Sequence, residues 1–281
     1  DCNAVVKESK VSEKRLSEAA VYAQQWIPFV SAYLNWKGLD AAIWWLHAHT
    51  NSYHNAETET EIAKYSKVPV VDFKDGAVDT EWFRTAYKSM GKAKWKVLYD
   101  AAKYISDGRG HKRAQLYADV VLGNTKITEV TKRVKDKRNQ DYLRVYGLVP
   151  LSRGNRDKDL LKRYQYLQLF KKESKQFGSQ RQASEGLATR IAMDNLARTA
   201  GFSDPIRLTW AMEAAEAKQI MEKAEKLVFG AVEIYLSIDD KGKSSIICNK
   251  AGKKMSAIPA KLRKEKSVVE LKAFNKTLRN Q

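Results

Sequence analysis

The stretch from Thr80 to Ile105, TEWFRTAYKSMGKAKWKVLYDAAKYI, decides the fold class. Its apolar residues recur every three or four positions, which is the spacing of one face of an α-helix. They are Trp82, Phe83, Ala86, Tyr87, Met90, Trp95, Leu98, Tyr99, Ala102 and Ile105. Gly91 is expected to divide the pattern, because glycine weakens a helix interior. The stretch therefore predicts two amphipathic helices in succession.

Helical spacing continues on both sides of this stretch. It is found from Leu16 to Leu34, in the aromatic segment AAIWWLHAH, and through most of the chain up to residue 226. Between Tyr65 and Asp79 the sequence is expected to form a loop, because proline, glycine and acidic residues interrupt the pattern. Gly147 is expected to end a helix as its C′ residue.

The spacing of the apolar residues changes from helical to alternating after Leu227. Val232, Ile234, Leu236 and Ile238 alternate with polar residues, a turn follows at Asp239 to Gly242, and Ser245 to Cys248 can return as a second strand. A basic helix is expected over about 260–278. We predict a mainly α fold, an irregular multi-helix array with a small β-hairpin near the C-terminus.

This pattern predicts two domains. Residues 1–226 form a helical domain, with a sub-boundary near 147–157. Residues 227–281 contain the β-hairpin and the basic C-terminal helix, which we expect to pack on the helical domain.

The net charge of +18 is unevenly distributed along the chain. Residues 1–102 carry 13 basic and 13 acidic side chains, and residues 164–240 carry 10 and 11. Residues 103–163 carry 16 basic against 7 acidic side chains, and residues 241–281 carry 12 against 2. The whole excess lies in these last two blocks, and such blocks favour acidic partners.

The two basic blocks supply candidate contacts for a nucleic acid or an acidic protein. In the first block the candidates are Arg109, Lys112, Arg113, Lys132, Arg133, Lys135, Lys137, Arg138, Arg153 and Arg156, and Lys158 follows them as a further possible phosphate contact. In the second block they are Lys261, Arg263 and Lys264. No cluster matches a named nucleic-acid-binding motif, and basic faces that are only solvated are the competing interpretation.

A polar stretch over residues 173–213 offers an alternative, enzymatic function. Its candidate side chains are Glu173, Arg181, Glu185 and Asn195. Arg181 and Glu185 stand four residues apart and can pair along a helix. No complete acid–base or nucleophile system is present, so hydrogen bonding between helices is the competing interpretation. We expect a non-enzymatic interaction or regulatory module without a cofactor, and keep an uncharacterised enzyme as the alternative.

Three histidines in one short stretch invite a metal hypothesis. On a helix, His47 and His54 would lie roughly 10 Å apart along the axis, too far to share one ion, and His49 lies on another face. Packing among Trp44 and Trp45 is the competing interpretation, and we expect no metal site.

Cysteine usage and hydropathy predict a cytoplasmic protein. Cys2 and Cys248 lack any ligand spacing, which favours free thiols in a reducing compartment. Apolar runs such as residues 41–46 are far shorter than the roughly 20 residues of a membrane span, so no membrane partner is expected. No signal peptide follows Asp1, and we expect the chain to begin inside a longer protein.

A set of short segments runs in order through nearly the whole chain. It comprises AQQW at 23–26, WKGL at 36–39, AHT at 48–50, GHKRAQLYAD at 110–119, KRNQ at 137–140, GLVPL at 147–151, ESKQFGSQRQASE at 173–185, NLARTAG at 195–201, RLTWAME at 207–213 and GKKMSAIP at 252–259. Together they resemble the large bacterial proteins named molybdate metabolism regulator-like (MolR-type), whose C-terminal region is a domain of unknown function. The resemblance implies further domains of a parent protein as partners. Proteins of this kind often carry a separate Trp-Gly-Arg (WGR) module, which contacts DNA ends, and we do not expect it within the sequence given. The resemblance implies no catalytic residues.

Overall fold

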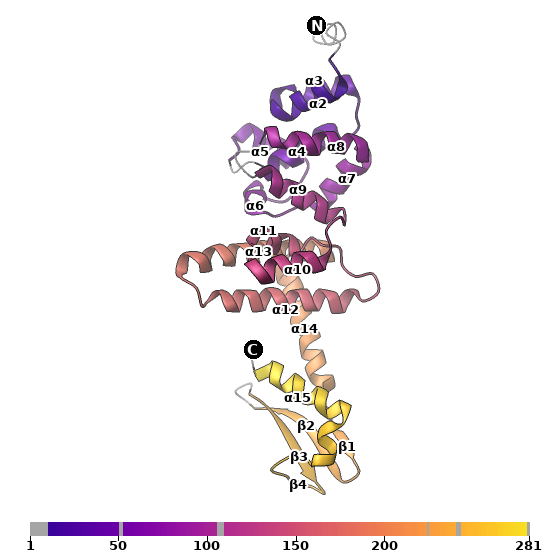
Figure 1. The fold of residues 1–281 in the computed structure, drawn as a ribbon, viewed down its shortest axis with the longest axis vertical. Coiled ribbons are helices and arrows are strands. Elements are labelled where there is room, and N and C mark those ends of the chain that lie inside the picture. The colour runs from indigo at the N-terminus through magenta and orange to yellow at the C-terminus, as the bar shows by residue number, and fades with distance from the viewer. Residues whose placement is uncertain (1–10, 51–52, 106–109, 224, 240–242, 280–281) are drawn as a thin grey trace. The chain divides into compact units, whose positions relative to one another are not determined.

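The structure is a computed structural model that describes residues 11–50, 53–105, 110–223, 225–239 and 243–279, without the side chains of residues 220–223 and 277. The chain forms two compact units, Asp1–Thr209 and Trp210–Gln281. The division falls inside the helix α14 (Pro205–Lys223), whereas the sequence placed it after residue 226. The predicted mainly helical fold with a small β element near the C-terminus is confirmed (Figure 1). No helix in the described part of the chain is long and apolar enough to cross a membrane.

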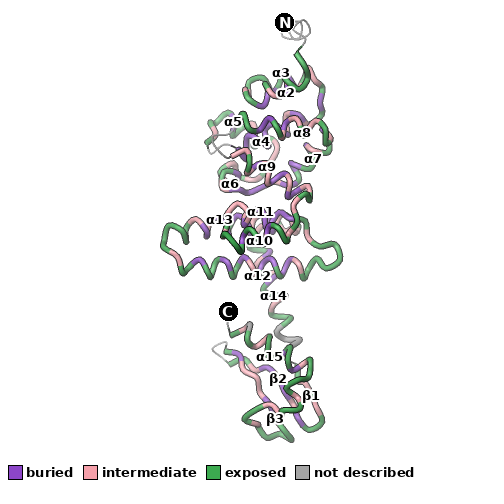
Figure 2. The backbone as a smooth tube through the Cα atoms, viewed as in Figure 1, coloured by how far each residue is buried: buried purple, intermediate pink, exposed green. Residues whose placement is uncertain are grey.

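The first layer of the first unit is built around α4 (Leu39–Thr50), whose side chains are mostly buried (Figure 2). The surrounding elements are α2 (Glu13–Tyr22), η1 (Gln24–Trp26), α3 (Ile27–Leu34), α5 (Ala56–Ala63), α6 (Val70–Asp75), α7 (Thr80–Met90), α8 (Lys92–Ala101), η2 (Ala102–Tyr104) and α9 (Gly110–Val121). Trp45 on α4 is fully buried, and its ring centroid lies 4.7 Å from that of Phe83 and 6.0 Å from that of Trp95. Burial of these large rings supplies much of the driving force for this layer.

The stretch that decides the fold class forms α7 and α8, as predicted. Gly91 separates the two helices with a φ of +81°, a backbone conformation that favours glycine. The loop predicted between Tyr65 and Asp79 is wrong in part, because α6 lies within it. Phe73 on α6 is fully buried, so contacts with the core stabilise a helix too short to show a periodic pattern.

The second layer of the first unit consists of α10 (Ile127–Lys137), α11 (Gln140–Tyr146), α12 (Arg156–Ser174) and α13 (Ser179–Ala200) (Figure 1). Gly147 follows α11, but its φ of −72° is right-handed, so the C′ role predicted for it is wrong. A Cβ at this position would lie 2.6 Å from the backbone nitrogen of Leu196 on α13 and closer still to the carbonyl oxygen of Ala192. Glycine is required here by the close approach of two backbones.

The second unit contains a four-stranded antiparallel sheet in the order β1-β2-β3-β4. Its strands are β1 (Leu227–Phe229), β2 (Val232–Ile238), β3 (Ser244–Lys250) and β4 (Lys253–Lys254). The predicted hairpin is the β2–β3 pair, in which Ile234 lies opposite Cys248. After η3 (Ala260–Lys264), the helix α15 (Lys266–Arg279) places Val268 and Leu271 in the same apolar core as Ile234.

Candidate functional site

Glu185 on α13 lies at the centre of a charge cluster formed by α10, α12 and α13. Its side chain is 1% exposed, and its carboxylate accepts hydrogen bonds from Nε and Nη2 of Arg138 at 3.0 and 2.7 Å. It also accepts from Oγ of Ser174 at 2.5 Å and from Nε of Arg181 at 2.9 Å, which confirms the pairing predicted four residues apart. Each carboxylate oxygen therefore has two donors, which fills the acceptor capacity of the group.

Arg138 occupies the end of α10, where its φ is +45°. The guanidinium lies 3.8 Å from the ring centroid of Phe170 and also donates to Glu173 at 2.9 Å and to the carbonyl oxygen of Phe170 at 3.2 Å. A left-handed backbone is unfavourable for arginine, so these contacts hold the residue in place. Arg138 was expected on a basic surface, but the structure gives it two carboxylate partners.

Burial alone would raise the pKa of Glu185, but hydrogen bonds from Arg138, Ser174 and Arg181 outweigh it and lower this pKa to about 2. The same bond to Glu185 is the main cause of a raised pKa at Arg138. At neutral pH the carboxylate is thus ionised and fully occupied by donors. Such a group holds helices together and offers no free lone pair to a substrate proton.

Asn195, the fourth residue of the polar stretch, lies apart from the Glu185 cluster. It is completely buried, its Oδ1 accepts from the N–H of Val78 at 2.9 Å, and its Nδ2 donates to the carbonyl oxygens of Gly76 and Arg144 at 3.1 Å each. The side chain satisfies backbone groups of the segment before α7 and of α11. The structure therefore does not bring the four polar candidates together.

The clustered histidines lie in and beside the first layer. His47 is buried, its Nδ1 accepts from Nε2 of Gln24 at 3.0 Å, and burial lowers its pKa to about 4. His49 is fully buried, its ring centroid lies 5.4 Å from that of Tyr117, and burial lowers its pKa. His54 is half-buried, and burial lowers its pKa too. Within the described residues, no group of three or more His, Cys, Asp and Glu side chains could hold a metal ion.

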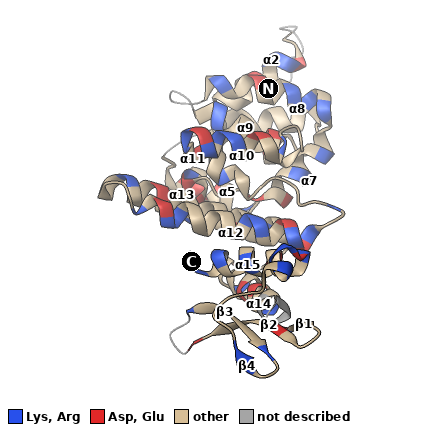
Figure 3. Cartoon of the chain, turned by 60° about the horizontal axis from the view of Figure 1, so that its bottom comes forward, with Lys and Arg blue, Asp and Glu red and all other residues tan. Residues whose placement is uncertain are grey.

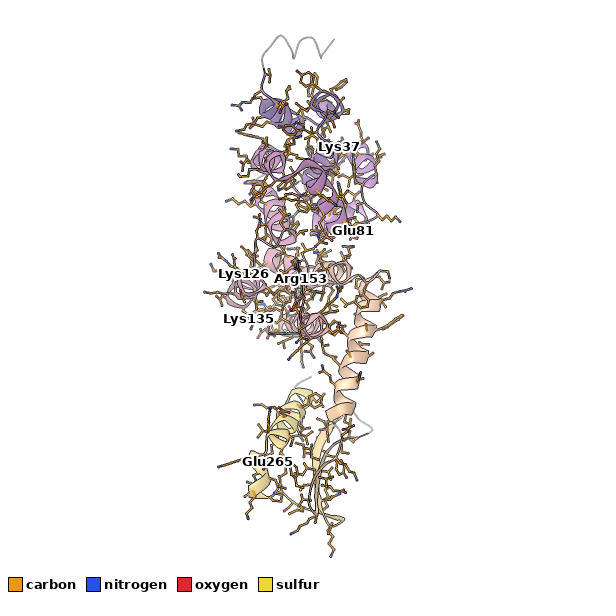
Figure 4. All side chains as sticks on the ribbon, turned by 90° about the vertical axis from the view of Figure 1, so that its right-hand side faces the viewer. Lys37, Glu81, Lys126, Lys135, Arg153 and Glu265 are labelled. Carbon is orange, nitrogen blue, oxygen red and sulfur yellow. The ribbon has the colours of Figure 1, made fainter. Side chains whose placement is uncertain are left out.

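The basic candidates of the first block divide by their partners. Arg109 lies outside the described residues, Arg113 is half-buried, and Arg156 donates to the carbonyl oxygen of Ala200 at 2.7 Å. The candidates that are exposed and have no carboxylate partner among the described residues are Lys112, Lys132, Arg133, Lys135, Lys137 and Arg153. Figure 3 shows basic residues in blue along α10 and α12, and Figure 4 labels Lys135 and Arg153.

The second basic block lies in the second unit. Lys261, Arg263 and Lys264 are on η3, and only Arg263 has a hydrogen bond, donated by Nε to the carbonyl oxygen of Ile258 at 2.8 Å, among the described contacts. All three side chains are exposed. They remain available to a partner of the second unit.

The helices α10 and α12 lie side by side along one surface of the second layer. Nζ of Lys135 on α10 lies 5.9 Å from the ring centroid of Tyr166 on α12. Nearer the start of both helices, Ile127 lines a cavity of about 370 Å³ together with Pro150, Ser152, Asn155, Lys158, Asp159, Lys162 and Arg163. We name this surface the α10–α12 face and define it by Lys132, Lys135, Lys158, Lys162 and Tyr166.

Arg163 forms a fixed wall of this cavity. It is 2% exposed, and its Nε and Nη2 donate to the carboxylate of Asp159 at 3.0 and 2.7 Å. It also donates to the carbonyl oxygens of Val149 and Pro150 at 2.5 and 3.1 Å. The charges of Arg163 and Asp159 are thus matched, whereas Lys158 and Lys162 are exposed and have no carboxylate partner among the described residues.

The sequence interpretation missed Lys162 as a candidate. The available signal was its spacing of four residues from Lys158 on a predicted helix, which places both lysines on one face. Only the structure shows that this face adjoins α10.

The comparisons with known proteins bear on the first unit. No curated protein and no solved structure matches the chain. A family model described as a family of unknown function, DUF5724, matches residues 2–212, a range that ends close to the division between the two units after Thr209. The resemblance to molybdate metabolism regulator-like proteins stays a prediction. Because the matched range covers most of the chain, this protein belongs to the DUF5724 family, whose function is unknown.

Proposed function

We propose that the α10–α12 face binds the phosphate backbone of a nucleic acid. One observation carries the proposal. Four exposed lysines of two adjacent helices have no carboxylate partner among the described residues, although the same layer pairs Arg138, Arg144 and Arg163 with acids. An array of unpaired cations attracts phosphates and releases their counterions on binding.

The cavity at the start of α12 supports an anionic ligand. Asn155 precedes the helix without a side-chain cap bond, and the helix is 19 residues long. The backbone N–H groups and dipole at such a helix start favour negative charge. Lys158 and Lys162 line the same cavity. Of the two acidic residues in the first turn of α12, Asp159 is balanced by Arg163 and Asp157 does not line the cavity.

Aromatic rings between the cations favour nucleic acid over an acidic protein. Nζ of Lys135 lies over the ring of Tyr166, so this face places an aromatic ring directly beside a cation. Rings interleaved with cations are a common way of binding unpaired bases together with their phosphates. A nucleic-acid ligand also agrees with the expected cytoplasmic location and non-enzymatic role.

The experiment measures binding of labelled single-stranded and duplex DNA by fluorescence anisotropy over a salt series. The test variant is Lys158→Glu with Lys162→Glu, and the control is Lys37→Glu with Lys67→Glu, exposed lysines of the first layer. Each double variant removes the same amount of positive charge. We expect the test variant to lose at least about tenfold in affinity at low salt. The slope of log affinity against log salt concentration should fall by about one to two.

The control should bind within about twofold of the unchanged protein. An equal loss in both double variants would report only the net charge and contradict the proposed face. Salt-insensitive or absent binding of both DNA forms would contradict nucleic-acid binding itself, and binding of an acidic peptide instead would assign the face to a protein partner.

A further inference from the structure

A larger cavity, of about 660 Å³, opens between α7, α8 and α9. Its lining residues are Tyr87, Lys92, Ala93, Trp95, Lys96, Tyr99, Asp119, Leu122 and Asn124. Small-molecule sites in proteins have volumes of roughly 300–1,000 Å³, mostly apolar walls and a few polar groups. None of these residues belongs to the α10–α12 face, so the cavity is a separate site.

Three aromatic rings form the apolar part of the cavity. Trp95 is 5% exposed and lies deepest, whereas Tyr87 and Tyr99 are half-buried. The ring centroids of Tyr87 and Tyr99 lie 6.3 and 6.4 Å from that of Trp95, with interplanar angles of 72° and 69°. Rings at these angles leave faces and edges on which a flat ligand ring can pack.

Asp119 provides an acceptor at the polar side of the cavity. Its Oδ2 accepts from the hydroxyl of Tyr99 at 2.9 Å, and its Oδ1 accepts from Nδ2 of Asn124 at 3.2 Å. These bonds fix the carboxylate, and each oxygen retains a lone pair. Two adjacent N–H groups on the edge of a ligand can therefore both donate to this carboxylate at the same time.

Lys92 provides an unmatched positive charge at the rim. Lys92 and Lys96 stand four residues apart on α8, so they share a helix face. Lys96 forms an ion pair with Asp100, whereas Lys92 is exposed and has no carboxylate partner in the described part of the chain. The cavity thus combines stacking surfaces, a fixed acceptor and, among the described residues, the unpaired cation of Lys92.

We infer that this cavity binds a nucleotide. The base packs among Tyr87, Trp95 and Tyr99, its N–H edge donates to Asp119, and its phosphate pairs with Lys92. Guanine matches best, because its N1–H and N2–H groups are adjacent donors that pair with the two oxygens of one carboxylate. The nucleotide is either a free molecule or one unit of a single strand, since both present the same base and phosphate.

Isothermal titration calorimetry with GMP and guanosine tests the inference. We expect GMP to bind about tenfold more tightly than guanosine at low salt, because guanosine lacks the phosphate. Lys92→Ala should weaken GMP about tenfold and leave guanosine within about twofold. Asp119→Asn should weaken both ligands at least about tenfold, because it replaces an acceptor oxygen by a donor.

Lys88→Ala on α7 is the control, since Lys88 is exposed and does not line the cavity. Its GMP affinity should equal that of the unchanged protein. The variant Lys158→Glu with Lys162→Glu should also keep GMP binding, so failure of the α10–α12 face and failure of this site are distinguishable. Circular dichroism checks that each variant folds, and Lys92→Ala is a surface change that keeps the test valid if Asp119→Asn unfolds.

A single-stranded oligonucleotide identifies the source of the nucleotide. If Lys92→Ala weakens its binding as much as that of GMP, the site takes a unit of a strand. If only GMP is affected, the site takes the free nucleotide. A GMP dissociation constant weaker than about 1 mM, or GMP binding that Lys92→Ala leaves unchanged, overturns the inference.

Discussion

The basic side chains of one helix, α10, differ in whether they have carboxylate partners. Arg138, directly after the last residue of α10, is held by Glu173 and Glu185, whereas Lys132 and Lys135 within α10 have no carboxylate partner among the described residues. The sequence gives all three the same place in one basic block. The difference shows that a block's net charge does not reveal which of its cations are free to bind a ligand.

Side-chain chemistry follows the same division. The paired cations Arg138, Arg144 and Arg163 are 16%, 12% and 2% exposed, and each donates to backbone carbonyl oxygens as well as to a carboxylate. The planar guanidinium suits such buried, multiply bonded positions. The four cations of the α10–α12 face are lysines, whose compact charge stays hydrated at the surface.

The largest effect on stability is expected at Glu185, the buried carboxylate that pairs with Arg138 and Arg181. Glu185→Gln removes the charge that balances Arg138 and Arg181, and breaking a buried pair by changing one partner costs about 3–5 kcal/mol. Urea unfolding followed by circular dichroism measures the loss. Glu173→Gln is the control, because Glu173 also pairs with Arg138 but is 47% exposed, and its loss should stay below about 1 kcal/mol. Equal losses would remove the distinction between the two carboxylates.

A second effect is expected from pH. The pKa of Glu185 is about 2 in the folded protein, below its ordinary value of about 4.5, so its contribution to stability is complete above the ordinary value. It is lost progressively as the pH falls from about 4.5 toward 2, and amounts to about 3 kcal/mol. Urea midpoints of the unchanged protein and of Glu185→Gln should converge over this range. A constant gap between the two curves would show that another group supplies the acid sensitivity.

The smallest effect on stability is expected from the exposed lysines of the α10–α12 face. Lys132→Ala with Lys135→Ala removes two exposed cations without a carboxylate partner, so the free energy of unfolding should change by less than about 0.5 kcal/mol. The same variant should flatten the salt dependence of DNA binding. Thermal unfolding and fluorescence anisotropy measure the two quantities on one preparation. A stability loss as large as that of Glu185→Gln would mean that these lysines also hold the fold together.

Local pattern predicted much of the fold, because most helices here bury one face. The two helices divided by Gly91 and the alternating strand from Val232 to Ile238 follow directly from apolar spacing. The close approach at Gly147 does not, because the constraint comes from the backbone of α13 rather than from a turn. The helix at Val70–Asp75 was not predicted for a related reason, because contacts with the core stabilise it.

The sites depended even more on contacts between distant segments. The Arg181–Glu185 pair could be predicted from its spacing, but Arg138 reaches Glu185 across 47 residues of sequence and no local pattern reports it. The cavity between α7, α8 and α9 draws its residues from Tyr87 to Asn124. Only the folded chain brings its aromatic rings and Asp119 together.

Asn195 gives the first unit a property that concerns its cooperativity. One buried amide joins α13 and α11 of the second layer to the turn that precedes α7 in the first layer. When α13 detaches, the N–H of Val78 loses its acceptor, although Val78 lies 117 residues away in sequence. Opening of the second layer therefore leaves a backbone N–H of the first layer without its acceptor, and we expect the Val78 amide proton to exchange together with those of α13.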